Sequence, residues 1–281
     1  MEINHYLKFF PGILAVAFLL LFIIKKVFRK KLLLQKKPYL LPVPLLLIAI
    51  LLLISYRIVK AVQSEYYFRK SLKTKLVKEI YDYQRLAIIT NPNIDIYRVQ
   101  FSRTNLMLAN SLLAKSKELS DQDKQIATQA IKAAIEEAKA AVKLNDHKAA
   151  NWAHLADVYR NLLKVAQNAD VWSISAFQRA IILDPQNANY RLDLGGVYYL
   201  VKDYDQALRQ LEQAIALKPD WPNAYYNLAW VYYQKKDYQK AVEQMNKVIT
   251  LLDKNKDASD YQKAQKELEE FKLKLLEEKS S

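Results

Sequence analysis

The sequence is poor in the residues on which much of protein chemistry depends. It has 281 residues but no Cys, only three Gly and only three His. The absence of Cys excludes disulfides and thiol chemistry, and no Gly-rich loop of the kind that cradles phosphates is present. The histidines, His5, His147 and His154, match no standard spacing of metal ligands. We therefore expect no enzyme, and we predict no catalytic residue, no metal site and no cofactor.

The second half of the chain repeats itself with a period of 34 residues. Residues 188–221 align without a gap with residues 222–255. The alignment pairs Leu194 with Leu228, Gly195 with Ala229, Tyr198 with Tyr232, and Ala207 with Ala241. A fixed period of this size indicates an array of structural repeats.

Each period predicts a pair of packed helices. Leu194 and Tyr198 recur at helical spacing on one face, and Gly195 and Ala207 are small where two helices must approach closely. Pro219 cannot continue a helix and ends the second one. The apolar face that one pair leaves open can be covered only by the next pair, so we expect the pairs to stack.

The pattern resembles the tetratricopeptide repeat (TPR), with its Leu-Gly pair, a Tyr three residues later, small Ala positions and a Pro after the second helix. The resemblance implies an all-α solenoid of helical hairpins. We expect degenerate TPR-like helices over 63–148, three repeats over 149–187, 188–221 and 222–255, and a C-terminal capping helix over 258–278. Within the degenerate segment the expected helices are 65–72, 76–90, 94–117 and 121–144, with Ser120 as an N-cap. Extra residues near 164–170 predict a longer connection in the first repeat.

Two hydrophobic runs, 9–24 and 39–54, precede the repeats. With their flanking residues, both approach the roughly 20 residues that cross a bilayer. A cleavable signal peptide is the alternative for the first run, but no basic segment precedes it and no small-x-small site follows it. We predict a transmembrane hairpin over residues 1–62, and hence a multi-pass protein of the cell membrane.

The positive charge is concentrated beside these runs. Residues 1–90 hold 16 of the 43 Lys and Arg but 4 of the 29 Asp and Glu. The loop 25–37 has seven basic residues and no acid, namely Lys25, Lys26, Arg29, Lys30, Lys31, Lys36 and Lys37. The positive-inside rule makes this loop cytoplasmic and the TPR region extracytoplasmic, although the basic residues from Arg57 to Lys78 weaken the contrast. Anionic lipids are the expected partner of the loop. Nucleic acid is not expected, because the repeat region is almost neutral.

The TPR resemblance implies that the first helix of each pair lines a concave groove that binds a ligand. We predict a ligand-binding groove formed by Asn189, Tyr199, Asn223, Tyr226, Asn227, Trp230 and Tyr233. Tyr and Trp are favoured anchors for a protein or peptide partner, and the amides beside them would also suit a glycan. The other interpretation of Tyr226 and Trp230 is that they are partly core residues between repeats. The Lys and Asn with which one TPR class grips a C-terminal carboxylate are absent, apart from Asn227.

A wider resemblance concerns the order of the segments. Terminal membrane helices followed by a TPR tail, and the stretch NIDIYRVQFSRTNLMLANSLL at 93–113, are similar to the C-terminal parts of bacterial O-antigen ligase/polymerase-type membrane proteins. The many-helix catalytic region of that family is missing. We therefore predict a membrane-anchored TPR scaffold that binds a protein or peptide partner in its groove. The alternative is an accessory subunit of cell-envelope polysaccharide assembly that contacts a glycan or its enzyme.

Overall fold

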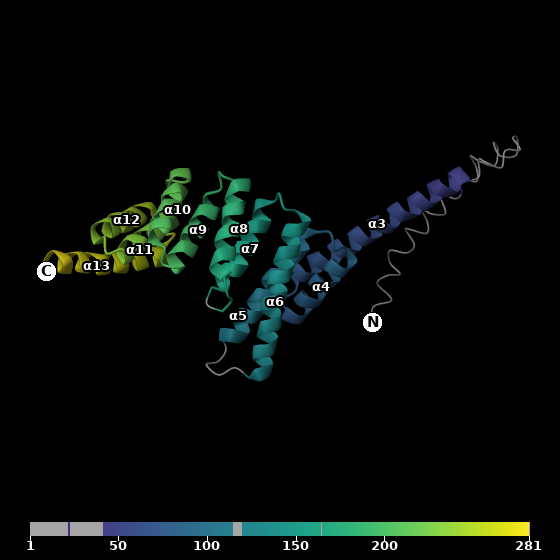
Figure 1. Cartoon of the computed structure of the whole chain (residues 1–281), viewed down its shortest axis with the longest axis horizontal. Helices are drawn as coiled ribbons and strands as arrows, with labels where there is room; N and C mark the ends of the chain where they lie inside the picture. Colours follow the sequence, from purple (N-terminus) through teal and green to yellow (C-terminus); the bar gives the residue numbers. More distant parts are fainter. Residues whose placement is uncertain (1–21, 23–41, 115–119, 164, 281) are drawn as a thin grey trace, which may run out of the picture. The chain divides into compact units, whose positions relative to one another are not determined.

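The fold is all-α, as the sequence predicts. The computed structural model describes residues 22, 42–114, 120–163 and 165–280. Eleven helices are bounded within this part of the chain (Figure 1): α3 Pro42–Lys73, α4 Val77–Thr90, α5 Asp95–Ala114, α6 Asp121–Leu144, α7 Ala149–Asn161, α8 Ala169–Leu183, α9 Ala188–Leu200, α10 Tyr204–Leu217, α11 Pro222–Gln234, α12 Tyr238–Leu251 and α13 Ala258–Ser280. They fall into two compact units, residues 1–97 and residues 98–281.

The first unit contains one helix that is long and apolar enough to cross a membrane. This is the Leu46–Lys73 part of α3, which is 28 residues long and is the one candidate span among the described residues. Its apolar side chains are exposed, Leu46 by 63% and Leu53 by 58%. The structure therefore offers one of the two predicted spans by length and composition. The other run, 9–24, and the basic loop 25–37 lie outside the described residues.

The rest of the first unit packs against the C-terminal half of α3. Phe68, Ala87 and Tyr97 form its small core. The Tyr97 ring lies 4.7 Å from the Phe68 ring, and the Tyr97 hydroxyl donates to Oε2 of Glu65 at 3.1 Å. The separate helix expected over 65–72 does not exist, because these residues continue α3 to Lys73 without a break.

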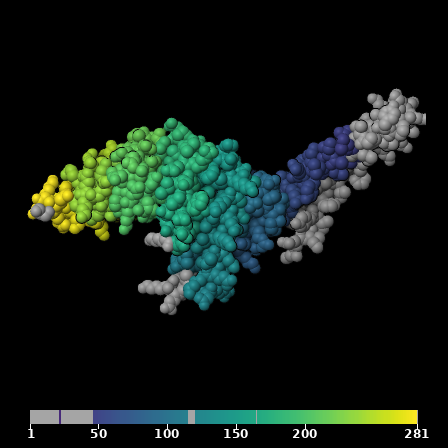
Figure 2. Space-filling model, viewed as in Figure 1, coloured from purple at the N-terminus to yellow at the C-terminus, as the bar shows by residue number. Residues whose placement is uncertain are grey.

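The second unit stacks its helices in chain order. Along the series from α6 to α13 each helix packs against the next (Figure 1), and in space-filling view the green-to-yellow part of the chain is one continuous body (Figure 2). Helix α5 joins α6 through Ser102, whose hydroxyl donates to the Ala134 carbonyl at 2.7 Å. The expected N-cap at Ser120 is confirmed, since its hydroxyl accepts from the Asp123 amide at 3.1 Å.

The 34-residue offset is visible in the helix bounds. Helices α9 and α11 begin at Ala188 and Pro222, and α10 and α12 at Tyr204 and Tyr238. The turns between them match as well. Lys202 and Lys236 adopt the left-handed conformation, with φ of 66° and 63°, and the following residues, Asp203 and Asp237, cap the next helix with their side chains. The corresponding connection between α7 and α8 is longer, residues 162–168 against 201–203.

Small residues set how closely the helices approach. Ala207, Ala214, Ala229 and Ala241 are fully buried. A Cβ on Gly195 would lie 2.8 Å from Cγ of Leu211, which is shorter than any normal contact. The close approach that the sequence predicts at Gly195 is therefore required by the packing of α9 on α10.

Candidate functional site

Three of the predicted site residues lie on α11 and contact α13. The Tyr226 hydroxyl donates to Oε1 of Glu267 at 3.1 Å. The Trp230 indole N–H donates to Oε2 of the same carboxylate at 3.3 Å. The Tyr233 hydroxyl donates to Oε1 of Glu270 at 3.1 Å. All three aromatic side chains are half-buried, and their polar atoms face the C-terminal helix.

The rings of this group pack on Phe271 of α13, which has no exposed surface. Trp230 meets Phe271 edge-on at 5.1 Å between centroids, and Tyr233 stacks on it at 4.5 Å. Burial, and then the hydrogen bond to Glu270, raise the pKa of Tyr233. In this arrangement Trp230 and Tyr233 belong largely to the contact between α11 and α13. For Trp230 this contact favours the interpretation as a partly core residue over that of a purely exposed binding residue.

Tyr199 lies apart from α13, on α9. Its ring centroid is 5.9 Å from that of Tyr204. Burial is the main cause that raises the pKa of Tyr199, and the nearby Tyr204 raises it further. Gln234 and Tyr226 of α11 also affect this pKa. The side chain of Tyr199 therefore lies on the face of α9 that is turned towards α11.

Two of the three predicted amides, Asn189 and Asn223, lie at the beginnings of α9 and α11, and Asn227 lies one turn further along α11. Asn227 donates from Nδ2 to the Asn223 carbonyl at 2.7 Å and to its Oδ1 at 3.0 Å. Asn189 donates from Nδ2 to Oδ1 of Asn187, the N-cap of α9, at 3.1 Å. Asn223 and Asn189 are both exposed, and each lines a groove.

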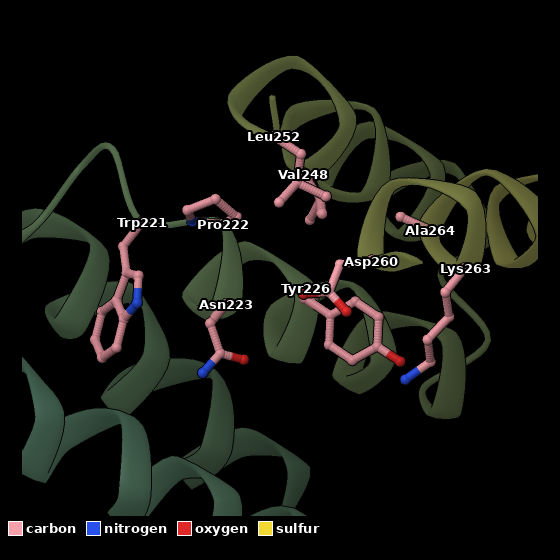
Figure 3. A pocket seen from close by; sticks show the side chains of 9 residues that line it. All are labelled: Trp221, Pro222, Asn223, Tyr226, Val248, Leu252, Asp260, Lys263 and Ala264. Atoms are coloured by element: carbon pink, nitrogen blue, oxygen red, sulfur yellow. The ribbon is translucent and has the colours of Figure 1, made fainter. Parts of the chain in front are cut away.

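The first groove, called the α11 groove below, has a volume of about 440 Å³. Its wall is formed by the start of α11, the end of α12 and the start of α13. The lining residues are Trp221, Pro222, Asn223, Tyr226, Val248, Leu252, Asp260, Lys263 and Ala264 (Figure 3). Lys263 extends towards Tyr226 and places its Nζ 4.9 Å from the ring centroid, and the pKa of Lys263 is raised by its hydrogen bond to the Tyr226 hydroxyl.

The second groove, called the α9 groove, has a volume of about 400 Å³. The lining residues are Asp184, Gln186, Asn187, Ala188, Asn189, Leu217 and Lys218. The sequence pattern did not indicate Trp221, Asp260 and Lys263 in one groove, nor Asp184 and Lys218 in the other. The 34-residue period could have indicated that the surroundings of Asn189 and Asn223 correspond, but it could not show how α13 closes one side.

A charged cluster on α7 and α9 was also missed. The guanidinium of Arg160 pairs with Asp193 at 2.9 Å and with Asp157 at 2.8 Å. Burial raises the pKa of Asp157 to about 6, against the opposing charge of Arg160. Burial, with Arg103 nearby, lowers the pKa of His154 to about 4. His154 is thus a packed, neutral residue at neutral pH. Among the described residues no group of three or more His, Asp and Glu could hold a metal ion.

The comparisons with known proteins agree with the repeat geometry. A family model for the tetratricopeptide repeat matches residues 201–256. Tetratricopeptide-repeat sequence is therefore present over residues 201–256. A search of curated proteins finds no match, and none of the comparisons supports the resemblance to O-antigen ligase/polymerase-type proteins.

Solved structures show the same fold. MamA from residue 41 to its end, from Desulfovibrio magneticus RS-1, is 17% identical with a TM-score of 0.54, and the match covers 70% of this chain and 97% of that one. TTC0263, a thermophilic TPR protein in Thermus thermophilus, is 20% identical with a TM-score of 0.53, covering 75% and 99%. A crystal structure of MamA is 20% identical with a TM-score of 0.52, covering 70% and 94%. The solenoid is a TPR fold.

Proposed function

We propose that this chain is a membrane-anchored TPR scaffold, without catalytic activity, that binds a protein or peptide partner on the surface of its solenoid. Repeat solenoids of this kind use their extended surfaces for binding. The observation that carries the proposal is the α11 groove, where Asn223 and Tyr226 line an open hollow of about 440 Å³. A hollow of this size with an apolar floor and a few polar groups is typical of a binding site.

The seven predicted site residues divide into three groups within this proposal. Asn189, Asn223 and Tyr226 line the grooves and contact the partner directly. Trp230 and Tyr233 hold α13 in place and contribute through the parts of their rings that stay exposed. Tyr199 and Asn227 flank the same helices.

The anchoring is proposed from α3. Its exposed apolar side chains between Leu46 and Val62 match the chemistry of a lipid interior. A multi-pass arrangement, which follows from the hydrophobic runs 9–24 and 39–54, remains part of the proposal. Anionic lipids bound by the loop 25–37 and an extracytoplasmic solenoid, which follow from the charge pattern, remain part of it as well. So do the limits of the three repeats, 149–187, 188–221 and 222–255.

Affinity purification of the full chain from detergent-solubilised membranes tests the function. We expect the wild type to retain a defined protein, and the Tyr226→Ala variant to retain several-fold less of that protein. Asn110→Ala is the matched control, because Asn110 is exposed on α5, away from both grooves. Equal retention by all three proteins, or no specific retention by any of them, contradicts the proposal.

A further inference from the structure

We propose that the turn between α3 and α4 is a docking surface outside the repeats, which binds an acidic segment of another membrane protein. This surface, called the α3–α4 turn surface below, consists of residues 69–78. The inference goes beyond the binding of a partner by the solenoid, and it rests on the proposed anchoring of the chain by α3.

The turn surface carries positive charge without a matching acid. It contains five basic side chains and no Asp or Glu. Arg69 is paired with Glu65 at 2.6 Å, and the Lys70 Nζ lies 4.8 Å from the centroid of the Tyr83 ring. The other three, Lys73, Lys75 and Lys78, are exposed and form no ion pair with any residue that the structure describes.

Three large apolar side chains lie among these cations and are exposed. Leu72, Leu76 and Val77 have exposed fractions of 59%, 62% and 61%. Single exposed apolar residues are common on protein surfaces, but a group of them rimmed by polar residues marks a site that contacts another molecule. A partner must therefore match two properties of this surface, its unpaired positive charge and its apolar area.

Hydrogen bonds hold the turn in a defined conformation. The Thr74 hydroxyl donates to Oε2 of Glu79 at 2.6 Å and accepts from the Leu76 amide at 3.3 Å. The Thr74 amide donates to the Lys70 carbonyl at 3.2 Å. Because the turn is already ordered, a partner that binds it incurs little of the entropy cost of fixing a mobile loop.

The length of α3 places the turn surface above the membrane rather than in it. The exposed apolar part of α3 ends at Val62, and the helix continues without a break to Lys73, eleven residues further on. This length of α-helix extends about 16 Å, and a tilt of about 40° still leaves about 12 Å. The headgroup layer is only about 5–8 Å thick. Leu72 and Leu76 therefore do not reach the hydrocarbon of the membrane that α3 is proposed to cross.

The charge and the height of the surface together favour one class of partner. The unpaired lysines favour an acidic segment, and the exposed aliphatic side chains favour apolar residues within that segment. Two copies of this chain cannot meet symmetrically through the turn, because lysines would then face lysines. A segment held about 12–16 Å above the hydrocarbon is best presented by a protein in the same membrane, since shared anchoring raises the effective concentration.

Site-specific photo-crosslinking of the full chain in intact membranes tests the surface, with the photoreactive side chain at Leu76. Ile89 is the control position, because it is 60% exposed and lies near the other end of α4. We expect an adduct between Leu76 and a membrane protein, which mass spectrometry maps to an acidic segment within about eleven helical residues of a membrane span. Position 89 should give no adduct with that segment.

Charge reversal separates recognition from proximity. The triple variant Lys73→Glu, Lys75→Glu and Lys78→Glu should lower the yield of the Leu76 adduct about tenfold, as for the loss of three exposed ion pairs. The matched control reverses three exposed lysines elsewhere, Lys132, Lys254 and Lys266, and therefore has the same net charge. Its adduct yield should equal that of the unreversed chain. Both triple variants should melt close to the wild type, because all six lysines are exposed.

The remaining outcomes overturn the proposal. Adducts from Leu76 that form mainly with lipid, with nucleic acid or with a second copy of this chain assign the surface to that molecule instead. No adduct, or an adduct that the turn variant leaves unchanged, shows that the lysines recognise no acidic partner. Extraction of the chain from membranes by alkaline carbonate overturns the anchoring, and equal retention by Tyr226→Ala overturns the groove, so these failures are distinguishable from failure of the turn surface.

Discussion

The indole N–H of Trp230 donates to Oε2 of Glu267 at 3.3 Å, which ties the first helix of the last repeat to the C-terminal helix. The same carboxylate accepts from Tyr226 at its other oxygen. One acidic side chain of α13 thus orders two of the aromatic residues that the sequence marks as a binding surface. Helix α13 therefore both closes the stack and forms one wall of the α11 groove.

This contact predicts that Trp230 contributes to stability as well as to the surface. Trp230→Ala removes the edge-on packing on Phe271 at 5.1 Å and should lower the free energy of unfolding by about 3 kcal/mol, as large-to-small changes in packed sites do. Trp172→Ala is the control, since Trp172 is 54% exposed on α8; we expect a loss below about 1 kcal/mol. Chemical denaturation of both variants measures the difference. Equal losses would show that the α11–α13 contact adds nothing.

The two glycines of α9 predict opposite effects of the same substitution. A Cβ on Gly195 meets Leu211 at 2.8 Å, whereas one on Gly196 meets nothing within 4 Å. Gly195→Ala should destabilise the protein by about 1–3 kcal/mol through overpacking. Gly196→Ala should stabilise it by up to about 1 kcal/mol through helix propensity. Thermal melting of the pair checks this, and two shifts of the same sign contradict the register of α9 on α10.

The left-handed turn residues predict a gain in stability. Lys202 and Lys236 have φ of 66° and 63°, a conformation that costs a residue with a side chain about 1 kcal/mol relative to Gly. Lys202→Gly and Lys236→Gly should therefore each raise the melting temperature. Lys247→Gly, at an exposed position inside α12, should lower it because Gly is a poor helix former. A loss of stability at both turn positions would contradict the turn geometry.

The charged cluster predicts two opposing pH effects in one window. The pKa of Asp157 is raised to about 6, so the folded state binds its proton more readily than the unfolded state. The contribution of Asp157 to the free energy of unfolding therefore increases as the pH falls from about 6 towards the ordinary carboxyl range. The pKa of His154 is lowered from its ordinary value of 6.5 to about 4. The contribution of His154 to the free energy of unfolding therefore decreases as the pH falls below about 6.5. Arg103, Arg160 and Asp193 are the charges that act on these two groups.

Single variants should uncover each effect. In Asp157→Asn the remaining His154 should make stability fall more steeply below pH 6 than in the wild type. In His154→Gln the remaining Asp157 should make stability rise over the same range. Denaturation at a series of pH values measures both slopes, and two variants with the wild-type slope would show that neither group is perturbed by burial.

The sequence was informative wherever a feature depended on local pattern or on the repeat itself. The period predicts the helix pairs around Leu194 and Leu228, and the spacing of Ser120 before α6 predicts its cap. The tight approach at Gly195 was predicted because a helix tolerates Gly poorly without a packing reason.

Features that depend on the packing of separate helices were not predictable. The bond between Trp230 and Glu267 depends on the rotation of α13, and the α11 groove depends on the distance between Asn223 and Lys263. The pairing of Arg160 with Asp193 joins residues from two repeats whose equivalent positions elsewhere carry other residues. The prediction of a separate helix over 65–72 was wrong, because the change from apolar to polar sequence after Val62 does not interrupt α3.

The central claim is that a protein or peptide partner binds on the surface of the solenoid that includes the α11 groove. Site-specific photo-crosslinking in intact membranes tests it most directly, with the photoreactive side chain placed at Asn189, at Asn223 or at the control position Asn110. The account predicts adducts to the same protein from positions 189 and 223 and none from 110. Adducts of equal yield from all three positions, or none from 189 and 223, would contradict it.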